Sequence, residues 1–272
     1  MNLSSVKHFL LDGDGVLYRG MNAIDGFERF FGLLAEREIG WALLTNNATR
    51  ARDEYIEKLA QLGLSADIEQ IFSSASVTAH HLQNDYPTGA TLYVIGEPGM
   101  KSQISEAGMR ILDGEDLPTE PVDAVVIGLD RSFTYNKLTV GSTLIRGGAR
   151  FIATNGDLTF PAADGIKPGA GSLVVALEAA CGQAPVVVGK PNRLIFEQAM
   201  HAIGAPPETT IMVGARRETD ILGASQQGLS TILVRSGVTQ DRDLARFDYQ
   251  PTWVMDNLAE IVDKIEQAFG HD

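Results

Sequence analysis

Two aspartates near the N-terminus have a spacing that could do chemistry. Asp12 and Asp14 follow the apolar run Phe9-Leu10-Leu11, with Gly13 between them and Gly15 after them. Residues two apart in an extended segment point the same way, so both carboxylates should face one site. Carboxylates held that close repel each other unless a cation or a shared proton lies between them. Hard oxygen ligands favour a divalent metal such as Mg2+, although a turn rich in Asp and Gly is an alternative for this segment taken alone.

Three further apolar runs end in polar residues. The first, residues 41–44, is followed by Thr45-Asn46-Asn47, whose hydroxyl, amides and backbone N–H groups ahead of a helix suit an anion. The same residues also suit a plain helix cap. The run 186–188 is followed by Gly189-Lys190-Pro191, which lacks the spacing of a P-loop. The run 211–213 leads through Gly214 to Asp220.

The four segments together resemble the motifs of the haloacid dehalogenase superfamily of phosphatases. The resemblance covers residues 8–235 and is closest to the subclass that contains NagD and the p-nitrophenyl phosphatases. It is carried by Asp12-Gly13-Asp14-Gly15-Val16-Leu17, Leu44-Thr45-Asn46-Asn47, Gly128-Leu129-Asp130-Arg131-Ser132-Phe133-Thr134-Tyr135, Ala153-Thr154-Asn155, Pro168-Gly169-Ala170-Gly171-Ser172, Gly189-Lys190-Pro191 and Gly214 to Asp220.

The resemblance implies a role for each matched residue. Asp12 is the expected nucleophile, forming an aspartyl-phosphate, and Asp14 the expected general acid and base. Phosphate is expected to bind to Thr45, Asn46 and Lys190, which would stabilise charge in the transition state. The expected cofactor is Mg2+, with the metal ligands Asp12, Asp14 and Asp220.

One residue departs from the family pattern. The fourth motif of the family reads Gly-Asp-x-x-x-Thr-Asp, and its first acid coordinates the metal; here that position is Ala215. Alanine has no oxygen to offer, and even outer-shell losses reduce metal affinity or activity roughly 10–100-fold. Two functions therefore stay open. One is a phosphatase for small phosphate monoesters such as sugar phosphates, phosphoglycolate or p-nitrophenyl phosphate. The other is a weakened or inactive relative that binds a phosphorylated metabolite or partner.

The composition fits a globular enzyme of 272 residues with a sizeable core. A net charge of −13 argues against nucleic acid and anionic membranes as partners. The single cysteine, Cys181, excludes an internal disulfide and favours a cytoplasmic setting. No signal peptide or membrane-spanning run is recognised. We expect a small phosphorylated metabolite as the binding partner, and a homodimer is a possible assembly.

Short apolar runs alternate with helical patterns, which predicts βαβ units and a parallel sheet. Strands are expected at 8–12, 41–45, 92–95, 123–127, 150–153, 185–188, 210–213 and 231–234. Helical stripes are expected within 50–62, 194–203 and 258–269. The fold class expected is α/β, with a Rossmann-like core of the haloacid dehalogenase type at 1–84 and 185–272 and an inserted α/β cap of the C2 type at 85–184.

Residues of the predicted cap should choose the substrate, because the core recognises only a phosphate. Asn155 and Asp157 follow a predicted strand and resemble a cap loop that faces the active site, although Asn155-Gly156 is also a tight-turn signal. Asp130 and Arg131 are expected to be structural. Arg216 and Arg217 are expected to be solvated, and the alternative is that either reaches an anionic ligand if the metal binds weakly.

Overall fold

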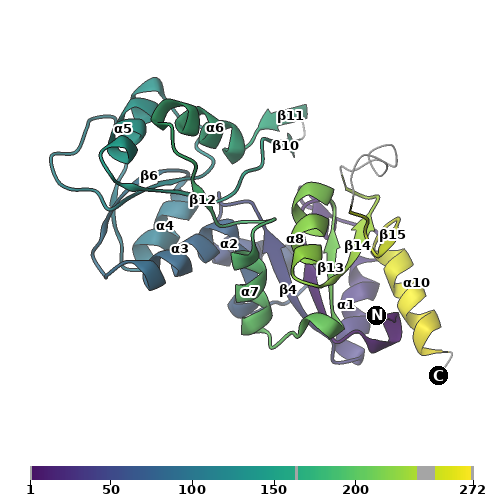
Figure 1. The fold of residues 1–272 in the computed structure, drawn as a ribbon. Coiled ribbons are helices and arrows are strands. Elements are labelled where there is room, and N and C mark those ends of the chain that lie inside the picture. Colours follow the sequence, from purple (N-terminus) through teal and green to yellow (C-terminus); the bar gives the residue numbers. More distant parts are fainter. Residues whose placement is uncertain (1, 163–164, 238–248, 271–272) are drawn as a thin grey trace. The chain divides into compact units, whose positions relative to one another are not determined.

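The computed structural model describes residues 2–162, 165–237 and 249–270 (Figure 1). The chain divides into two compact units. Unit 1 comprises Met1–Thr45, Asp53–Phe72 and Lys190–Asp272, and unit 2 comprises Asn46–Arg52 and Ser73–Gly189. Among the described residues, no helix combines the length and apolar character needed to cross a membrane.

Unit 1 is built on a six-stranded sheet with the order β15-β14-β13-β1-β4-β5. Strand β1 pairs in parallel with β13 and β4, and β14 pairs in parallel with β13 and β15. Strands buried on both faces need near-continuous apolar sequence, which these segments have. Their bounds are β1 His8–Leu11, β4 Gly40–Thr45, β5 Ile71–Ser73, β13 Thr210–Gly214, β14 Ser230–Val234 and β15 Trp253–Met255.

Helices connect the strands of this sheet, as parallel strands require. The helix α10 lies beside α1 and presents Leu258, Ile261 and Ile265 to the core. A short hairpin and single helical turns complete the unit. The elements are α1 Phe27–Glu36, α2 Arg52–Gln61, α7 Arg193–Ala202, α8 Leu222–Gln226, α10 Leu258–Phe269, β2 Tyr18–Arg19, β3 Asn22–Ala23, η1 Leu3–Ser5, η2 Ile68–Gln70, η3 Pro207–Thr209 and the π-type turn η4 Arg217–Ile221.

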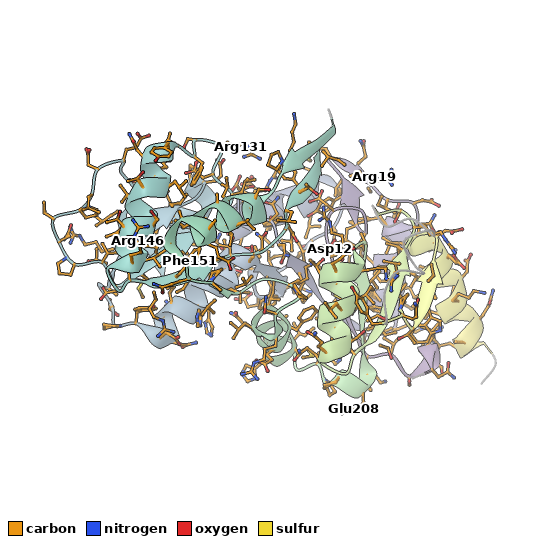
Figure 2. The ribbon with its side chains drawn as sticks, turned by 45° about the horizontal axis from the view of Figure 1, so that its top comes forward. Asp12, Arg19, Arg131, Arg146, Phe151 and Glu208 are labelled. Atoms are coloured by element: carbon orange, nitrogen blue, oxygen red, sulfur yellow. The ribbon has the colours of Figure 1, made fainter. Side chains whose placement is uncertain are left out.

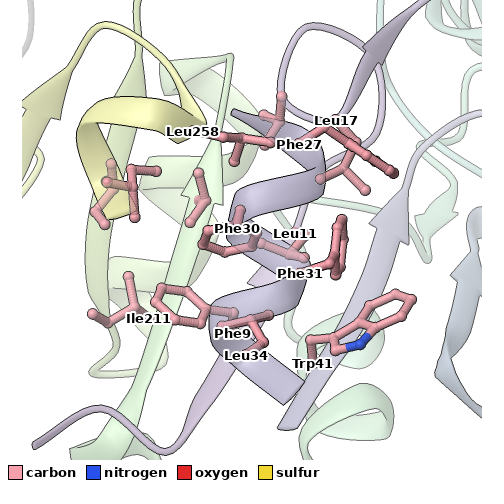
Figure 3. Packing of buried hydrophobic residues seen from close by; sticks show 14 of the residues in the cluster. Phe9, Leu11, Leu17, Phe27, Phe30, Phe31, Leu34, Trp41, Ile211 and Leu258 are labelled. Carbon is pink, nitrogen blue, oxygen red and sulfur yellow. The ribbon is translucent and has the colours of Figure 1, made fainter. Parts of the chain in front are cut away.

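The core of unit 1 is an aromatic cluster between α1 and the sheet (Figure 3). Phe30 is fully buried and meets Phe9 edge to face at a centroid distance of 5.3 Å. Phe31 packs in the same manner against Trp41 at 5.0 Å. Edge-to-face contacts of this kind add to the free energy gained by apolar burial, so this cluster anchors the strand that leads to Asp12.

Unit 2 has its own sheet with the order β12-β9-β8-β6-β7, all in parallel. Its core includes Tyr93, Val125, Ile127 and Phe151. The bounds are β6 Thr91–Ile95, β7 Arg110–Leu112, β8 Ala124–Ile127, β9 Arg150–Ala153, β12 Val186–Val187, the hairpin β10 Thr159–Ala162 with β11 Gly165–Pro168, α3 Ser74–Asp85, α4 Pro98–Glu106, α5 Tyr135–Arg146 and α6 Ala170–Cys181.

The unit boundaries differ from the expected domain boundaries. The sequence placed the first boundary after residue 84, whereas α3 belongs to unit 2 from Ser73 onward. The reason is packing, because α3 lies against α4. Residues 185–189 also belong to unit 2, since β12 pairs with β9. The two sheets share no strand, as the α/β core with an inserted α/β domain predicts.

A buried ion pair stabilises the loop after β8 in unit 2. Lys137 Nζ lies 2.8 Å from Asp130 Oδ2, and Ser132 donates to Asp130 Oδ1 through its N–H and its hydroxyl. Burial raises the pKa of Asp130, but the hydrogen bonds from Lys137 and Ser132 outweigh burial and leave the pKa below its usual value. Arg131 pairs separately with Glu97 at 3.1 Å.

The low pKa of Asp130 predicts an acid-sensitive contribution to stability. A depressed carboxyl pKa stabilises the fold above the unfolded value near 3.9, and this contribution is lost as pH falls through the folded value. We therefore expect the unfolding free energy of wild type to fall more steeply below about pH 4 than that of Asp130→Asn. Urea denaturation between about pH 7 and pH 3 measures the two slopes, and equal slopes would contradict the role of this pair.

Candidate active site

Lys190 lies at the centre of a buried polar cluster in unit 1. Its Nζ is 2.7 Å from Asp12 Oδ1 and 2.7 Å from Asp220 Oδ1, and it donates to the carbonyl oxygen of Leu44 at 2.8 Å. An ammonium has three protons to donate, so these three contacts use its full capacity. The Lys190 side chain is 2% exposed, whereas that of Asp12 is 14% exposed. Asp12, labelled in Figure 2, therefore keeps access to solvent.

The sheet brings these residues together. Asp12 directly follows β1, Leu44 and Thr45 end β4, and Asp220 lies in the turn after β13. Since β1 pairs with both β4 and β13 in parallel, three carboxyl ends meet at one edge. Ligands of open α/β sheets bind at this edge.

The electrostatics of the cluster follow from burial and charge. Burial and the nearby Asp220 carboxylate raise the pKa of Asp12 to about 7 against the opposing effect of Lys190. Burial lowers the pKa of Lys190, but the two carboxylates outweigh burial and leave the pKa above its ordinary value. Lys190 therefore remains a cation wherever Asp12 can be ionised.

Asp220 uses both carboxylate oxygens inside the protein. While Oδ1 binds Lys190, Oδ2 accepts hydrogen bonds from the N–H groups of Ala215 and Arg216 at 3.0 and 2.9 Å. Gly214 is required for this turn, because a Cβ there would lie 2.2 Å from the Cβ of Asp220. Asp220 thus holds the fourth motif in shape as well as facing the lysine.

Asp14 is the exposed residue of an otherwise buried turn that follows Asp12. The turn is closed by backbone hydrogen bonds from Leu17 N–H to the Gly13 carbonyl at 2.9 Å and from Gly15 N–H to the Tyr18 carbonyl at 2.8 Å. Gly15 has φ of +89°, a left-handed conformation that favours glycine. The turn leaves the Asp14 carboxylate reachable by a ligand.

Ala215 is packed rather than open. It is 1% exposed, and a Cβ on Gly237 would lie 2.4 Å from its own Cβ. The hydroxyl of Ser236 donates to the Gly15 carbonyl at 2.7 Å and fixes this contact. An apolar methyl therefore stands where the family pattern places a carboxylate.

The expected magnesium ligands do not form a three-acid site. Within 2–162, 165–237 and 249–270, no group of three or more His, Cys, Asp and Glu side chains is placed to hold a metal ion. The side chain of Ala215 contributes no oxygen, and both carboxylate oxygens of Asp220 are already hydrogen bonded. The residues present thus fall short of the ligand set that the resemblance implies.

The other predicted residues divide between the units. Thr45 is 3% exposed and belongs to unit 1 with Lys190. Asn46, Asn155 and Asp157 belong to unit 2 and lie together. Asn155 Nδ2 donates to the Asn46 carbonyl at 2.7 Å, and Asn46 Nδ2 donates to Asp157 Oδ2 at 3.2 Å.

The expectation that Arg217 is solvated was wrong. Its side chain is fully buried, its Nη2 donates to the Tyr249 carbonyl, and its guanidinium lies 5.2 Å from the centre of the Tyr249 ring. Arginine stacks on aromatic faces and buries its stem more readily than lysine. No local pattern in the sequence marks the distant Tyr249 as a partner of Arg217.

Sequence analysis also missed a lysine beside the first motif. Lys58 of α2 is 7% exposed, and its Nζ lies 3.3 Å from the centre of the Tyr18 ring. The Tyr18 hydroxyl would lie 2.5 Å from a Cβ on Gly13, so the ring covers the turn that carries Asp14. Tyr18 follows the motif directly, but nothing in the helical stripe of 50–62 distinguishes Lys58 from a solvated lysine.

Comparisons with known proteins agree with this fold. The family model of the haloacid dehalogenase-like hydrolases matches residues 9–110. The HAD-hydrolase-like family model matches residues 187–261. The chain is 37% identical over 262 residues to a dihydroxyacetone phosphatase of Corynebacterium glutamicum, covering 96% of this chain and 93% of the relative. It is 38% identical over 258 residues to the 5'-nucleotidase YutF of Bacillus subtilis, covering 95% and 98%.

Solved structures are similarly close. The 4-nitrophenylphosphatase of Thermotoga maritima superposes with a TM-score of 0.88 at 31% identity, covering 96% of this chain and 98% of that one. Fold and relatives define a class, the phosphoric monoester hydrolases with an α/β core. The chain belongs to the haloacid dehalogenase-like hydrolases, in the branch of NagD and the p-nitrophenyl phosphatases.

The cluster around Lys190 generates a stability prediction. Lys190→Met leaves two buried carboxylates without a cation, which should lower the unfolding free energy by about 3–5 kcal/mol. Without the cation the pKa of Asp12 rises further, and a raised carboxyl pKa costs stability as pH increases, so the loss should be larger at about pH 8 than at about pH 5.5. Urea denaturation at both pH values measures it. The control is Lys264→Met at an exposed position, which should change the unfolding free energy by less than about 0.5 kcal/mol. A loss in Lys190→Met that does not depend on pH would contradict the counterion role.

Proposed function

We propose that the protein is a phosphatase for small phosphate monoesters such as sugar phosphates. The observation that carries the proposal is the partly exposed Asp12 carboxyl held 2.7 Å from the buried ammonium of Lys190. Supporting it, relatives that match nearly the whole chain are named dihydroxyacetone phosphatase and acid sugar phosphatase. The partner is accordingly a small phosphorylated metabolite.

In the proposed reaction, a carboxylate oxygen of Asp12 attacks phosphorus and forms an aspartyl-phosphate while the ester P–O bond breaks. Asp14 gives its proton to the leaving alkoxide and then takes one from the water that hydrolyses the intermediate. Phosphate leaves and the Asp12 carboxylate is restored. Lys190 and Thr45 stabilise the charge that develops on the phosphoryl oxygens.

The proposed cofactor is Mg2+. A phosphate dianion that enters beside Asp12, Asp14 and Asp220 adds negative charge to a cluster in which Lys190 already faces two carboxylates. An added cation would therefore reduce the repulsion. With Ala215 at the fourth motif, we expect any such cation to bind weakly.

Ala215 favours a second candidate function. Without that acid the site could bind a phosphorylated metabolite or partner without useful turnover. The two candidates differ in a simple measurement, since both bind a phosphate monoester but only a phosphatase releases inorganic phosphate from it. The homodimer and the cytoplasmic location remain predictions.

The nucleophile can be tested by one isosteric change. Asp12→Asn removes the attacking charge with almost no change in volume, so it should abolish p-nitrophenyl phosphate hydrolysis while thermal unfolding stays cooperative. Release of p-nitrophenol in the presence of Mg2+ measures this for both proteins. A variant that hydrolyses the ester as fast as wild type would exclude the covalent mechanism.

Position 215 can be tested by restoring the acid. Ala215→Asp returns a hard oxygen ligand, so Mg2+ affinity and turnover should rise together by at least roughly tenfold. The gain should be largest at low Mg2+, and stability without metal should fall slightly because a third acid joins the cluster. Ala215→Asn, of equal size but neutral, is the control. Unchanged rate and Mg2+ dependence in Ala215→Asp would mean that another group already fills the position.

A further inference from the structure

Two passages of the chain between the units lie next to candidate phosphate-binding residues. We call the links Thr45–Asn46 and Gly189–Lys190 the crossings. At each crossing the residue on the unit 1 side is one expected to bind phosphate, Thr45 or Lys190. Whatever fixes the unit 2 side therefore constrains these residues through one covalent link.

The loop after β9 holds both crossings on the unit 2 side. The Thr154 carbonyl accepts a hydrogen bond from Gly189 N–H at 2.8 Å, and Asn155 Nδ2 donates to the Asn46 carbonyl at 2.7 Å. Asp157 Oδ2 accepts from Asn46 Nδ2 at 3.2 Å. Three residues of a single loop thus bind the backbone of both crossings and one side chain.

This contact is close and buried. A Cβ on Gly189 would lie 2.6 Å from both Asn46 Oδ1 and the Thr154 carbonyl, so only glycine permits the approach. Thr154 is fully buried and Asn155 is 4% exposed. Asn155 Oδ1 also accepts from Asp157 N–H at 3.1 Å, which fixes the loop itself. Buried polar networks that are satisfied in this way favour one geometry.

The unit 1 side is tied as well. Lys190 Nζ donates to the carbonyl of Leu44, the residue before Thr45, at 2.8 Å. The two stretches of chain are therefore held by the same loop on the unit 2 side and by a direct hydrogen bond on the unit 1 side. A change in the loop of unit 2 should be transmitted to Thr45 and Lys190.

We propose that Asn155 and Asp157 are positioning residues that set the geometry of the phosphate site through the two crossings. This rests on the proposed function. The sequence predicts direct contact with the substrate instead. That role is less favoured, because the Asn155 side-chain amide is hydrogen bonded to backbone groups and Asp157 accepts a hydrogen bond from Asn46. A displacement of about 1 Å can reduce a rate by roughly 100-fold, so small losses of order should be measurable.

The experiment compares variants that remove or keep each contact. Asn155→Ala removes the donor to Asn46, and Asp157→Ala removes the acceptor for its amide. Asp157→Asn keeps an acceptor oxygen but loses the charge. Tyr93→Phe is the control, since it removes a hydrogen bond of 2.6 Å to the Gly114 carbonyl in the same unit, away from the crossings. Inorganic phosphate affinity, p-nitrophenyl phosphate hydrolysis and amide hydrogen exchange are measured for all.

We expect Asn155→Ala and Asp157→Ala to weaken phosphate binding by roughly tenfold and to speed amide exchange at 45–47 and 189–190. Asp157→Asn and Tyr93→Phe should stay within about twofold of wild type at those sites. Unchanged exchange in Asn155→Ala would overturn the proposal, as would faster exchange with unchanged phosphate affinity. A loss in Asp157→Asn equal to that in Asp157→Ala would mean that the acceptor oxygen for Asn46 is not what matters, and would overturn the role given to Asp157. Wild type that binds no phosphate would refute the proposed function, while exchange still tests the crossings.

Discussion

The rest of the candidate site depends on the ion pairs that Lys190 forms with two carboxylates. One buried ammonium faces Asp12 and Asp220 at 2.7 Å each. Taking a lysine out of water is costly unless its charge and all its protons are matched, and here two carboxylates and the Leu44 carbonyl match them. Because the partners come from three neighbouring strand ends, the sheet register must be correct before the lysine can be buried. The charge cluster and the sheet therefore stabilise each other.

This arrangement leaves little positive charge to attract an anionic ligand, because one ammonium faces two carboxylates. Lys190 already forms ion pairs with two acids, and the exposed Asp14 adds a third acid nearby in the sequence. A relative with a metal would correct the balance with a divalent cation, whereas this chain places a methyl group at position 215. Asp12 and Lys190 face each other at 2.7 Å, but less positive charge is left for an anionic ligand than the motifs alone imply.

The sequence predicted long buried elements better than short or exposed ones. All eight expected strands correspond to observed strands, because each is an unbroken apolar run. Strands β5, β7 and β15 have three residues each and no clear alternation, and the hairpin of β10 and β11 is largely exposed, so pattern alone did not indicate them. The motifs indicated that Asp12, Lys190 and Asp220 share one site, and the three side chains do lie together. It could not indicate the Leu44 carbonyl, the burial of Arg217 or the stacking of Lys58 on Tyr18, since backbone acceptors and long-range partners leave no local signal.

Asp220 has a consequence for how such sequences change over evolutionary time. One of its oxygens neutralises Lys190 and the other closes the turn of the fourth motif, so selection for folding alone would preserve it after catalysis had ceased to matter. The same holds for Gly214, whose replacement would collide with Asp220. The side chain at position 215 has no comparable polar role, because it is a buried methyl packed beside Gly15 and Gly237. The contacts of Lys190 and Asp220 are therefore explained by the fold alone, and they say less about turnover than a carboxylate at position 215 would.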